Sequence, residues 1–228
     1  MPQAVLVTGG AGFIGSHLVD ALVRRGDRVT ALDDLSTGRL ANLDAFGGHE
    51  RFRFVQGSTL DELMVDEQVS CADVVVHLAA AVGVKLIVSD TLRSFITNLR
   101  GTEIVLDAAH RYRRPTLLAS SSEVYGKNES DGLTETADRV LGAPSVPRWS
   151  YATSKAADEV LAFAYHRERG LPVTVARFFN TVGPRQSPAY GMVIPTLVGQ
   201  ALDAVPLTVH GDGRQRRSFC HVADLVDA

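Results

Sequence analysis

Two groups of residues in this chain have the types and spacing that chemistry requires. Gly9, Gly12 and Gly15 form a Gly-x-x-Gly-x-x-Gly pattern, and Tyr151 lies four residues before Lys155. Glycines so spaced between a strand and a helix let the backbone turn tightly and approach a pyrophosphate, which then meets the free N–H groups of the helix N-terminus. On a helix, Tyr151 and Lys155 share one face, where an ammonium can stabilise a phenolate and make it a usable base. Together the two groups indicate oxidation and reduction by a nicotinamide cofactor.

The elements that must position these residues are predicted by short β-branched runs that alternate with longer helical patterns. Six strands are predicted, at Ala4–Thr8, 28–32, Phe52–Gln56, Val74–His77, 116–119 and Val173–Phe178. Helices are predicted over 12–25, 92–112 and 151–169, and Gly170 ends the last of them. This order is typical of an α/β fold with a doubly wound parallel sheet of the Rossmann type, which binds its ligand at the carboxyl ends of the strands.

The alternation of strands and helices becomes less regular after the sixth strand. From about Gly183 the sequence predicts a helix over 192–204, a short strand over 207–209 and a turn at 211–213. We therefore expect a cofactor-binding Rossmann domain over residues 1–182 and the beginning of a small substrate lobe over 183–228.

Composition narrows the classes of partner. The 228 residues suffice for one large α/β domain, and a net charge of -3 with scattered basic residues argues against nucleic acid and for a small molecule. Cys71 and Cys220 lack the spacing of a disulfide framework or a zinc site, so no metal is expected. No leader is recognised before the first strand, and no apolar run approaches the roughly 18 residues of a membrane span. A cytoplasmic protein without membrane contact is predicted.

The residues that follow the strands predict the identity of the cofactor. Asp33 and Asp34 follow the second strand at about the distance at which an acidic residue meets the adenosine ribose. A carboxylate there accepts hydrogen bonds from two ribose hydroxyls and repels a 2′-phosphate, which favours NAD over NADP. Further residues expected in the same groove are Phe13, Ile14, Ser58, Leu78, Ala79, Ala80 and Asn98.

Each of these motifs has an alternative interpretation. A glycine-rich segment alone also suits flavin, S-adenosylmethionine or no ligand, and Asp33 or Asp34 could cap a turn at the end of a strand. A Tyr and a Lys four residues apart are commonly a solvated pair. Here the strand, the glycine loop, the helix and the acidic residue occur in register, which favours the dinucleotide.

A serine-rich segment, Ser120-Ser121-Ser122-Glu123-Val124-Tyr125-Gly126, follows the fifth strand and puts Ser121 beside the edge of the cofactor. Further motifs are Thr8-Gly9-Gly10-Ala11-Gly12-Phe13-Ile14-Gly15, the Tyr151 and Lys155 pair, and Phe179-Asn180-x-x-Gly183-Pro184-Arg185. With these motifs the chain resembles the extended short-chain dehydrogenase/reductases of the NAD-dependent epimerase/dehydratase family, which modify nucleotide sugars. The resemblance runs from the first strand to the last residue.

The resemblance implies catalytic roles for three residues. Ser121 would hydrogen-bond the 4-hydroxyl of the sugar, and Tyr151 would remove its proton. Lys155 would bind the nicotinamide ribose and lower the pKa of Tyr151. Hydride would leave C4 for NAD+ and give a 4-keto sugar. The alternative for Ser121 is a turn residue at the end of a strand.

The resemblance also implies contacts with the rest of a nucleotide sugar. Asn180 would contact the diphosphate or the sugar, and Val193 with residues 207–209 would line the base pocket. Arg217 would grip the diphosphate, because the planar donors of a guanidinium pair with two oxygens at once. The alternative for Arg217 is a surface arginine.

The neighbours of Ser121 bear on the fate of the ketone. Dehydratases of the family place Asp where Ser122 stands, which argues against a dTDP-glucose 4,6-dehydratase. UDP-glucuronate decarboxylases commonly show Ser then Glu, as Ser122 and the catalytic candidate Glu123 do, and some carry an Arg-Trp pair like Arg148-Trp149. Against a decarboxylase, residues 81–85 replace the Pro-Pro-Tyr loop expected after the fourth strand.

We expect a 4-epimerase of a UDP-hexose or UDP-hexuronate, because epimerisation demands least beyond the residues present, and UDP-glucuronate decarboxylation is the alternative. A non-catalytic NAD-binding protein would belong to a different class and should lack the base, which this chain retains. The resemblance suggests a homodimer formed through helices 92–112 and 151–169. Members of the family usually continue beyond this length, so we expect an incomplete substrate lobe and a fragment of a longer chain.

Overall fold

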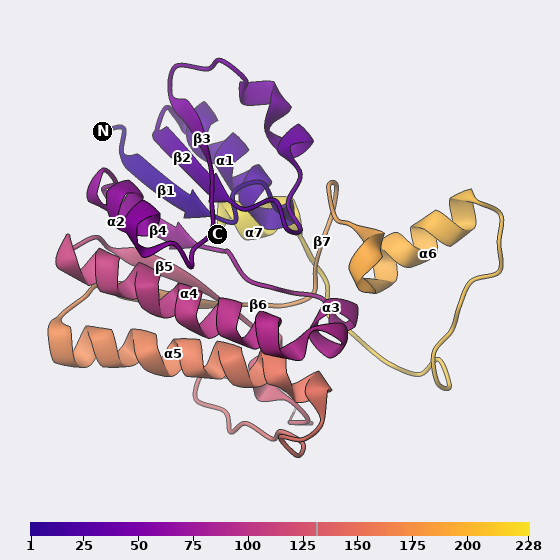
Figure 1. Cartoon of the computed structure of the whole chain (residues 1–228). Coiled ribbons are helices and arrows are strands. Elements are labelled where there is room, and N and C mark those ends of the chain that lie inside the picture. The colour runs from indigo at the N-terminus through magenta and orange to yellow at the C-terminus, as the bar shows by residue number, and fades with distance from the viewer. Residues whose placement is uncertain (131) are drawn as a thin grey trace.

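The structure of the chain is a computed structural model that describes residues 1–130 and 132–228 (Figure 1). Six parallel strands form one sheet in the order β3-β2-β1-β4-β5-β6. The strands are β1 Ala4–Thr8, β2 Arg28–Asp33, β3 Phe52–Gln56, β4 Val74–His77, β5 Thr116–Ser121 and β6 Val173–Phe178. The order reverses between β1 and β4, whose final residues Thr8 and His77 are paired. The predicted doubly wound sheet is confirmed, and a ligand crevice is expected beyond these two residues.

Helices cover both faces of the sheet (Figure 1). The α-helices are α1 Phe13–Arg25, α2 Glu62–Ser70, α3 Val84–Ser89, α4 Thr91–Arg111, α5 Ser150–Arg169, α6 Val193–Leu202 and α7 Val222–Asp227. The 3-10 helices are η1 Leu40–Phe46, η2 Ser122–Tyr125, η3 Pro147–Trp149 and η4 Pro188–Tyr190. The long helices α4 and α5 run side by side. The three long helices predicted from the sequence are confirmed to within a residue of their predicted ends.

Two apolar clusters, one on each face, hold the sheet between the helices. Along β1, Leu6 packs with Val105 of α4, whereas the next residue, Val7, packs with Val19 of α1. Successive side chains of a strand point to opposite faces, so a strand covered on both sides must be apolar throughout. Burial of one such leucine contributes about 2 kcal/mol to the free energy of folding. The clusters thereby fix the strand ends at which the site is built.

The predicted strand over 207–209 is wrong. This segment is irregular, and Leu207 and Val209 are 55% and 69% exposed. A strand needs a neighbour for its backbone hydrogen bonds, and no strand within the described ranges pairs with this segment. It follows α6, which stands away from the sheet in Figure 1. Residues 207–209 therefore have the apolar pattern of a strand but lack, among the described residues, the neighbouring strand that would pair with them.

The last residues return to the sheet. A second sheet pairs β7, Thr181–Val182, with β8, Cys220–His221, and α7 packs on α1. Val222 is buried there, and a Cβ on Gly183 would lie 2.6 Å from its side chain. These elements are too short to show a period in the sequence. In the part of the chain that the structure describes, no helix is long and apolar enough to span a membrane.

Candidate active site

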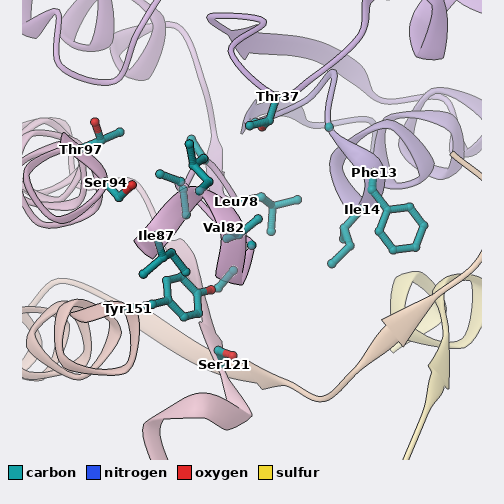
Figure 2. Close-up of a pocket in the computed structure, with 18 of the residues that line it drawn as sticks. Phe13, Ile14, Thr37, Leu78, Val82, Ile87, Ser94, Thr97, Ser121 and Tyr151 are labelled. Atoms are coloured by element: carbon teal, nitrogen blue, oxygen red, sulfur yellow. The ribbon is translucent and has the colours of Figure 1, made fainter. Parts of the chain in front are cut away.

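A cavity of about 590 Å³ opens at the carboxyl ends of the strands. The predicted site residues that line it are Gly9, Gly12, Phe13, Ile14, Gly15, Asp33, Asp34, Leu78, Ala79, Ala80, Ser121, Ser122, Glu123, Tyr151, Lys155 and Asn180. Figure 2 shows Tyr151 and Ser121 on one side of this cavity, with Phe13 and Ile14 of α1 across from them. The structure thus brings the glycine loop and the Tyr-Lys helix to one place, as their positions after strands predicted.

The glycine loop leaves no room for side chains. Gly9 has a φ of +71°, and a Cβ there would lie 2.8 Å from the backbone nitrogen of Ala79. A Cβ on Gly15 would lie 2.1 Å from the carbonyl oxygen of Gly9. The backbone is therefore bare where it borders the cavity, and α1 begins there. A bare backbone at a helix N-terminus fits the pyrophosphate of a dinucleotide.

Asp33 ends β2 and is buried at the edge of the cavity. One carboxylate oxygen accepts a hydrogen bond from Ala11 N at 2.9 Å and the other from Leu35 N at 2.8 Å. Burial raises the pKa of Asp33, and these backbone hydrogen bonds oppose the rise. Each oxygen keeps a lone pair for a further donor such as a ribose hydroxyl. Asp34 is exposed and accepts from Ser36 N at 2.9 Å, which is the turn-capping role considered as its alternative.

Ser121 and Tyr151 meet on one side of the cavity. Strand β5 extends to Ser121, whose hydroxyl caps η2 by accepting a hydrogen bond from Glu123 N at 3.2 Å. Burial raises the pKa of Tyr151 well above its ordinary value, and a hydrogen bond with Ser121 opposes this in part. The carboxylates of Glu123 and Asp158 raise it further. The expected lowering of this pKa is therefore not found, because burial outweighs the favourable contacts.

Lys155 lies one helical turn from Tyr151 on α5, and its side chain is 3% exposed. Its Nζ donates a hydrogen bond to the carbonyl oxygen of Ala119 at 3.0 Å. A carboxylate oxygen of Asp158 lies 3.2 Å from the same nitrogen. The ammonium thus contacts Ala119 and Asp158 within the protein, and Lys155 still lines the cavity.

A second charged pair lines the cavity beside Ser121. Arg148 Nη1 lies 2.7 Å from Glu123 Oε2, which joins η3 to η2. The guanidinium also stacks on Trp149, with its central carbon 5.5 Å from the ring centroid. Arg148 received no site role from sequence reasoning, although its place just before the Tyr151 helix was a usable signal.

Four predicted residues lie outside the lining of the cavity. Ser58 accepts a hydrogen bond from Leu60 N, and buried Asn98 bonds both the N–H and the carbonyl of Ala81. Val193 and Arg217 are exposed at or beyond α6, where Arg217 donates a hydrogen bond to a neighbouring carbonyl. Lining residues that were not predicted include Ser36, Thr37, Thr59, Ser94, Thr97, Gln186 and Met192. Single polar residues on α4 carry no motif, so only the fold reveals them.

Among the described residues, no group of three His, Cys, Asp or Glu side chains could hold a metal ion. The site consists of a bare glycine loop, a buried carboxylate and a Ser-Tyr-Lys group. It can cradle a dinucleotide and place a phenol and an ammonium beside a bound hydroxyl.

Comparison with known proteins agrees with this arrangement. The chain is 42% identical over 229 residues to a UDP-N-acetyl-alpha-D-glucosaminuronate decarboxylase of Bacillus cytotoxicus, covering 100% of this chain and 70% of that protein. It is 38% identical to UDP-glucuronic acid decarboxylase 1 of Xenopus tropicalis, covering 99% of this chain and 52% of the relative. The chain thus spans 52% to 70% of the length of these two curated relatives.

Solved structures give the same fold. A UDP-N-acetylglucosamine 4-epimerase from Methanobrevibacter ruminantium superposes with a TM-score of 0.91 at 32% identity, over 99% of this chain and 71% of that one. The model of the NAD dependent epimerase/dehydratase family matches residues 5–228, which include the glycine loop and the Ser-Tyr-Lys group. The chain belongs to this family of NAD-dependent enzymes.

Proposed function

We propose that this chain oxidises the C4 hydroxyl of a UDP-linked sugar, with Tyr151 as the base. The observation that carries the proposal is that Ser121, Tyr151 and Lys155 line the same cavity as the glycine loop. Ser121 ends β5, and the other two residues lie one turn apart on α5. A hydroxyl bound there can hydrogen-bond Ser121 and give its proton to Tyr151.

The residues present fit NAD. The glycine loop and the start of α1 would hold the pyrophosphate, Asp33 the adenosine ribose and Lys155 the nicotinamide ribose. When bound, NAD+ supplies a hydride acceptor for C4 and later returns the hydride. The protein's own contribution is to hold the hydroxyl and move its proton. Because burial raises the pKa of Tyr151, the base needs a positive charge nearby, which is the role proposed for Lys155.

For the fate of the ketone, we favour decarboxylation of a UDP-linked hexuronate over the epimerisation expected from sequence. In a 4-keto uronate the C6 carboxylate is β to the C4 ketone, so the electron pair of the C5–C6 bond can enter the carbonyl as carbon dioxide leaves, and C5 then takes up a proton. The Glu123–Arg148 pair supports this choice. A guanidinium suits a C6 carboxylate, and Glu123 offers a carboxyl group for the proton. The two curated relatives described above are named decarboxylases of uronate sugars.

4-Epimerisation is the second candidate. It needs only that the same 4-keto sugar turn over and take hydride back on the opposite face. The similar Methanobrevibacter structure is named as a 4-epimerase, which supports keeping this candidate. Both candidates begin with the same proton transfer to Tyr151.

One experiment separates them. The purified chain, supplied with NAD, is incubated with UDP-glucuronate and separately with UDP-glucose, and products are followed by chromatography with mass detection. Loss of carbon dioxide from UDP-glucuronate supports the decarboxylase. A new peak of unchanged mass from either sugar supports the epimerase, and an Arg148→Ala variant should impair the uronate reaction more than the glucose reaction.

We also propose a homodimer formed through α4 and α5, which lie side by side at one edge of the molecule in Figure 1. Leu92 and Ile96 of α4 and Val160 and Phe163 of α5 are exposed by 46–74%. Large apolar side chains that stay exposed on two neighbouring helices are typical of a protein interface. Sedimentation of wild type against a Leu92→Glu, Val160→Glu variant tests this, because charges should yield monomers. The cytoplasmic location and the domain boundary at residue 182 stay predictions.

A further inference from the structure

A row of buried polar side chains runs from the end of β1 to the middle of α5. Thr8 Oγ1 lies 2.7 Å from His77 Nδ1, and His77 Nε2 lies 3.2 Å from Thr102 Oγ1 on α4. The Thr102 hydroxyl faces Asp158 and lowers the pKa of that carboxyl, and Asp158 lies 3.2 Å from Lys155 Nζ. All five residues are buried. The row links the strand ends that border the cavity to the lysine of the site.

His77 is the neutral centre of this row. Ala79 N donates a hydrogen bond to Thr8 Oγ1 at 3.2 Å, so this hydroxyl has both a backbone partner and His77 as a partner. The two ring nitrogens of His77 lie between the hydroxyls of Thr8 and Thr102. Burial, with the nearby charge of Lys155, lowers the pKa of His77 to about 3, so the ring is neutral at ordinary pH. The only charges in the row belong to Asp158 and Lys155.

Asp158 depends on Lys155 for its charge balance. Its side chain is fully inaccessible, and this burial raises the pKa of its carboxyl. The polar groups of Lys155 and Thr102 lower that pKa. A buried carboxylate with so few polar partners needs a cation against it. The two residues therefore form one ionic unit beneath the cavity.

The ammonium of Lys155 has two contacts within the protein. An ammonium has three N–H donors. One is used by the carbonyl oxygen of Ala119 at 3.0 Å, and the Asp158 carboxylate lies 3.2 Å from the same nitrogen. Lys155 also lines the cavity, so one donor is left for a ligand there.

We propose that Asp158 is a positioning residue that holds the ammonium of Lys155 in place and directs its remaining N–H into the cavity. The inference rests on the proposed function, because it assigns to that N–H a contact with bound NAD. The same Asp158 charge raises the pKa of Tyr151 and so disfavours its phenolate form. The anion that holds the lysine in place thus also makes the phenolate form of Tyr151 harder to reach.

Other ionisable groups surround this unit. They are Tyr151 and Glu159 on α5, His77 on β4 and Glu123 on η2. Glu159 is already paired with Arg177 at 2.7 Å and Glu123 with Arg148 at 2.7 Å. Glu159 and Glu123 are therefore each paired with an arginine, and Asp158 is the carboxylate paired with Lys155.

The test is calorimetric titration with NAD+ at one fixed pH, which needs no turnover. We expect Asp158→Asn to weaken NAD+ binding by roughly tenfold, because the ammonium of Lys155 loses the carboxylate that orients it. In a Lys155→Met background the same exchange should leave the affinity unchanged, because no ammonium is left to position. Asp158→Ser removes the same charge with a smaller side chain and should give the same loss if the asparagine variant does not fold.

Glu159→Gln is the matched control, because it removes a buried charge from the neighbouring position of the same helix. Its affinity for NAD+ should equal that of wild type even though it loses the partner of Arg177. Wild-type affinity in both folded Asp158 variants, or an equal loss in the Lys155→Met background, would overturn the inference while leaving the proposed function intact. Wild type that binds no NAD+ would instead overturn the proposed function, and with it the role given to Lys155.

Discussion

Gly15 and Gly9 approach so closely that a Cβ on Gly15 would lie 2.1 Å from the carbonyl oxygen of Gly9. This contact fixes the distance between the start of α1 and the end of β1. The loop therefore tolerates no side chain at residue 15, whether or not a ligand is bound.

Gly15→Ala should accordingly destabilise the protein by about 3 kcal/mol, since overpacking against backbone has no flexible side chain to yield. NAD affinity should fall at least tenfold, as the loop must shift. Urea unfolding and calorimetry measure the two effects. Gly199→Ala is the control, because nothing lies within 4 Å of its Cβ position on α6. Equal stability of the two variants would contradict the tight contact.

Tyr151→Phe should lower turnover by roughly 10²- to 10⁴-fold, the range expected for loss of a general base. NAD binding should be retained, because the ring remains in place and only the hydroxyl is lost. Tyr112→Phe serves as the control, since its hydroxyl donates to Asp66 at 2.8 Å, away from the cavity. Steady-state kinetics and NAD titration of both variants check this. Turnover near that of wild type in Tyr151→Phe would remove it as the base.

Asp33→Asn should weaken NAD binding by roughly 10- to 100-fold, because a hydrogen bond to a charged acceptor contributes about 1.5–3 kcal/mol. NADP binding should fall less or improve, since the repulsion of a 2′-phosphate is removed. Asp34→Asn should change little, because Asp34 is exposed and caps a local turn. The ratio of NAD to NADP dissociation constants is the measurement. An unchanged ratio in Asp33→Asn would show that another residue selects the cofactor.

His77 should make stability fall in acid. Burial lowers its folded-state pKa to about 3 from an ordinary 6.5, so the unfolded chain binds a proton that the folded chain refuses. Its contribution is complete above pH 6.5 and is lost as pH falls toward 3, by up to about 1.4 kcal/mol per pH unit. Comparing urea unfolding of wild type and His77→Gln at pH 7 and pH 5 isolates this term. Parallel losses in the two proteins would mean that His77 does not titrate on unfolding.

The sequence predicted the parts of this protein that repeat or follow a strict spacing. The six strands and three long helices have clear periods, and the glycine, serine and Tyr-Lys motifs each follow a strand end, so their convergence at one sheet edge could be foreseen. The predicted strand over 207–209 failed because alternation specifies a strand only when a partner is present.

The rest depends on contacts between distant segments. Asp158 has no motif around it, and its pairing with Lys155 through one helical turn matters only because both are buried against β5 and α4. The lowering expected for the pKa of Tyr151 failed for a similar reason, because burial and two carboxylates cannot be read from a four-residue spacing. The spacing of residues along a helix predicts which face their side chains share, whereas their pKa values depend on burial and on contacts with distant segments.

The most direct test of the central claim, oxidation at sugar C4, is rapid mixing of the NAD-loaded chain with UDP-glucuronate while the absorbance of reduced nicotinamide is followed. We expect the absorbance of reduced nicotinamide to rise transiently in wild type. The transient rise should be smaller with substrate deuterated at C4, and it should be absent in Tyr151→Phe. Product formation from UDP-glucuronate without any reduced nicotinamide and without sensitivity to deuterium at C4 would contradict the account.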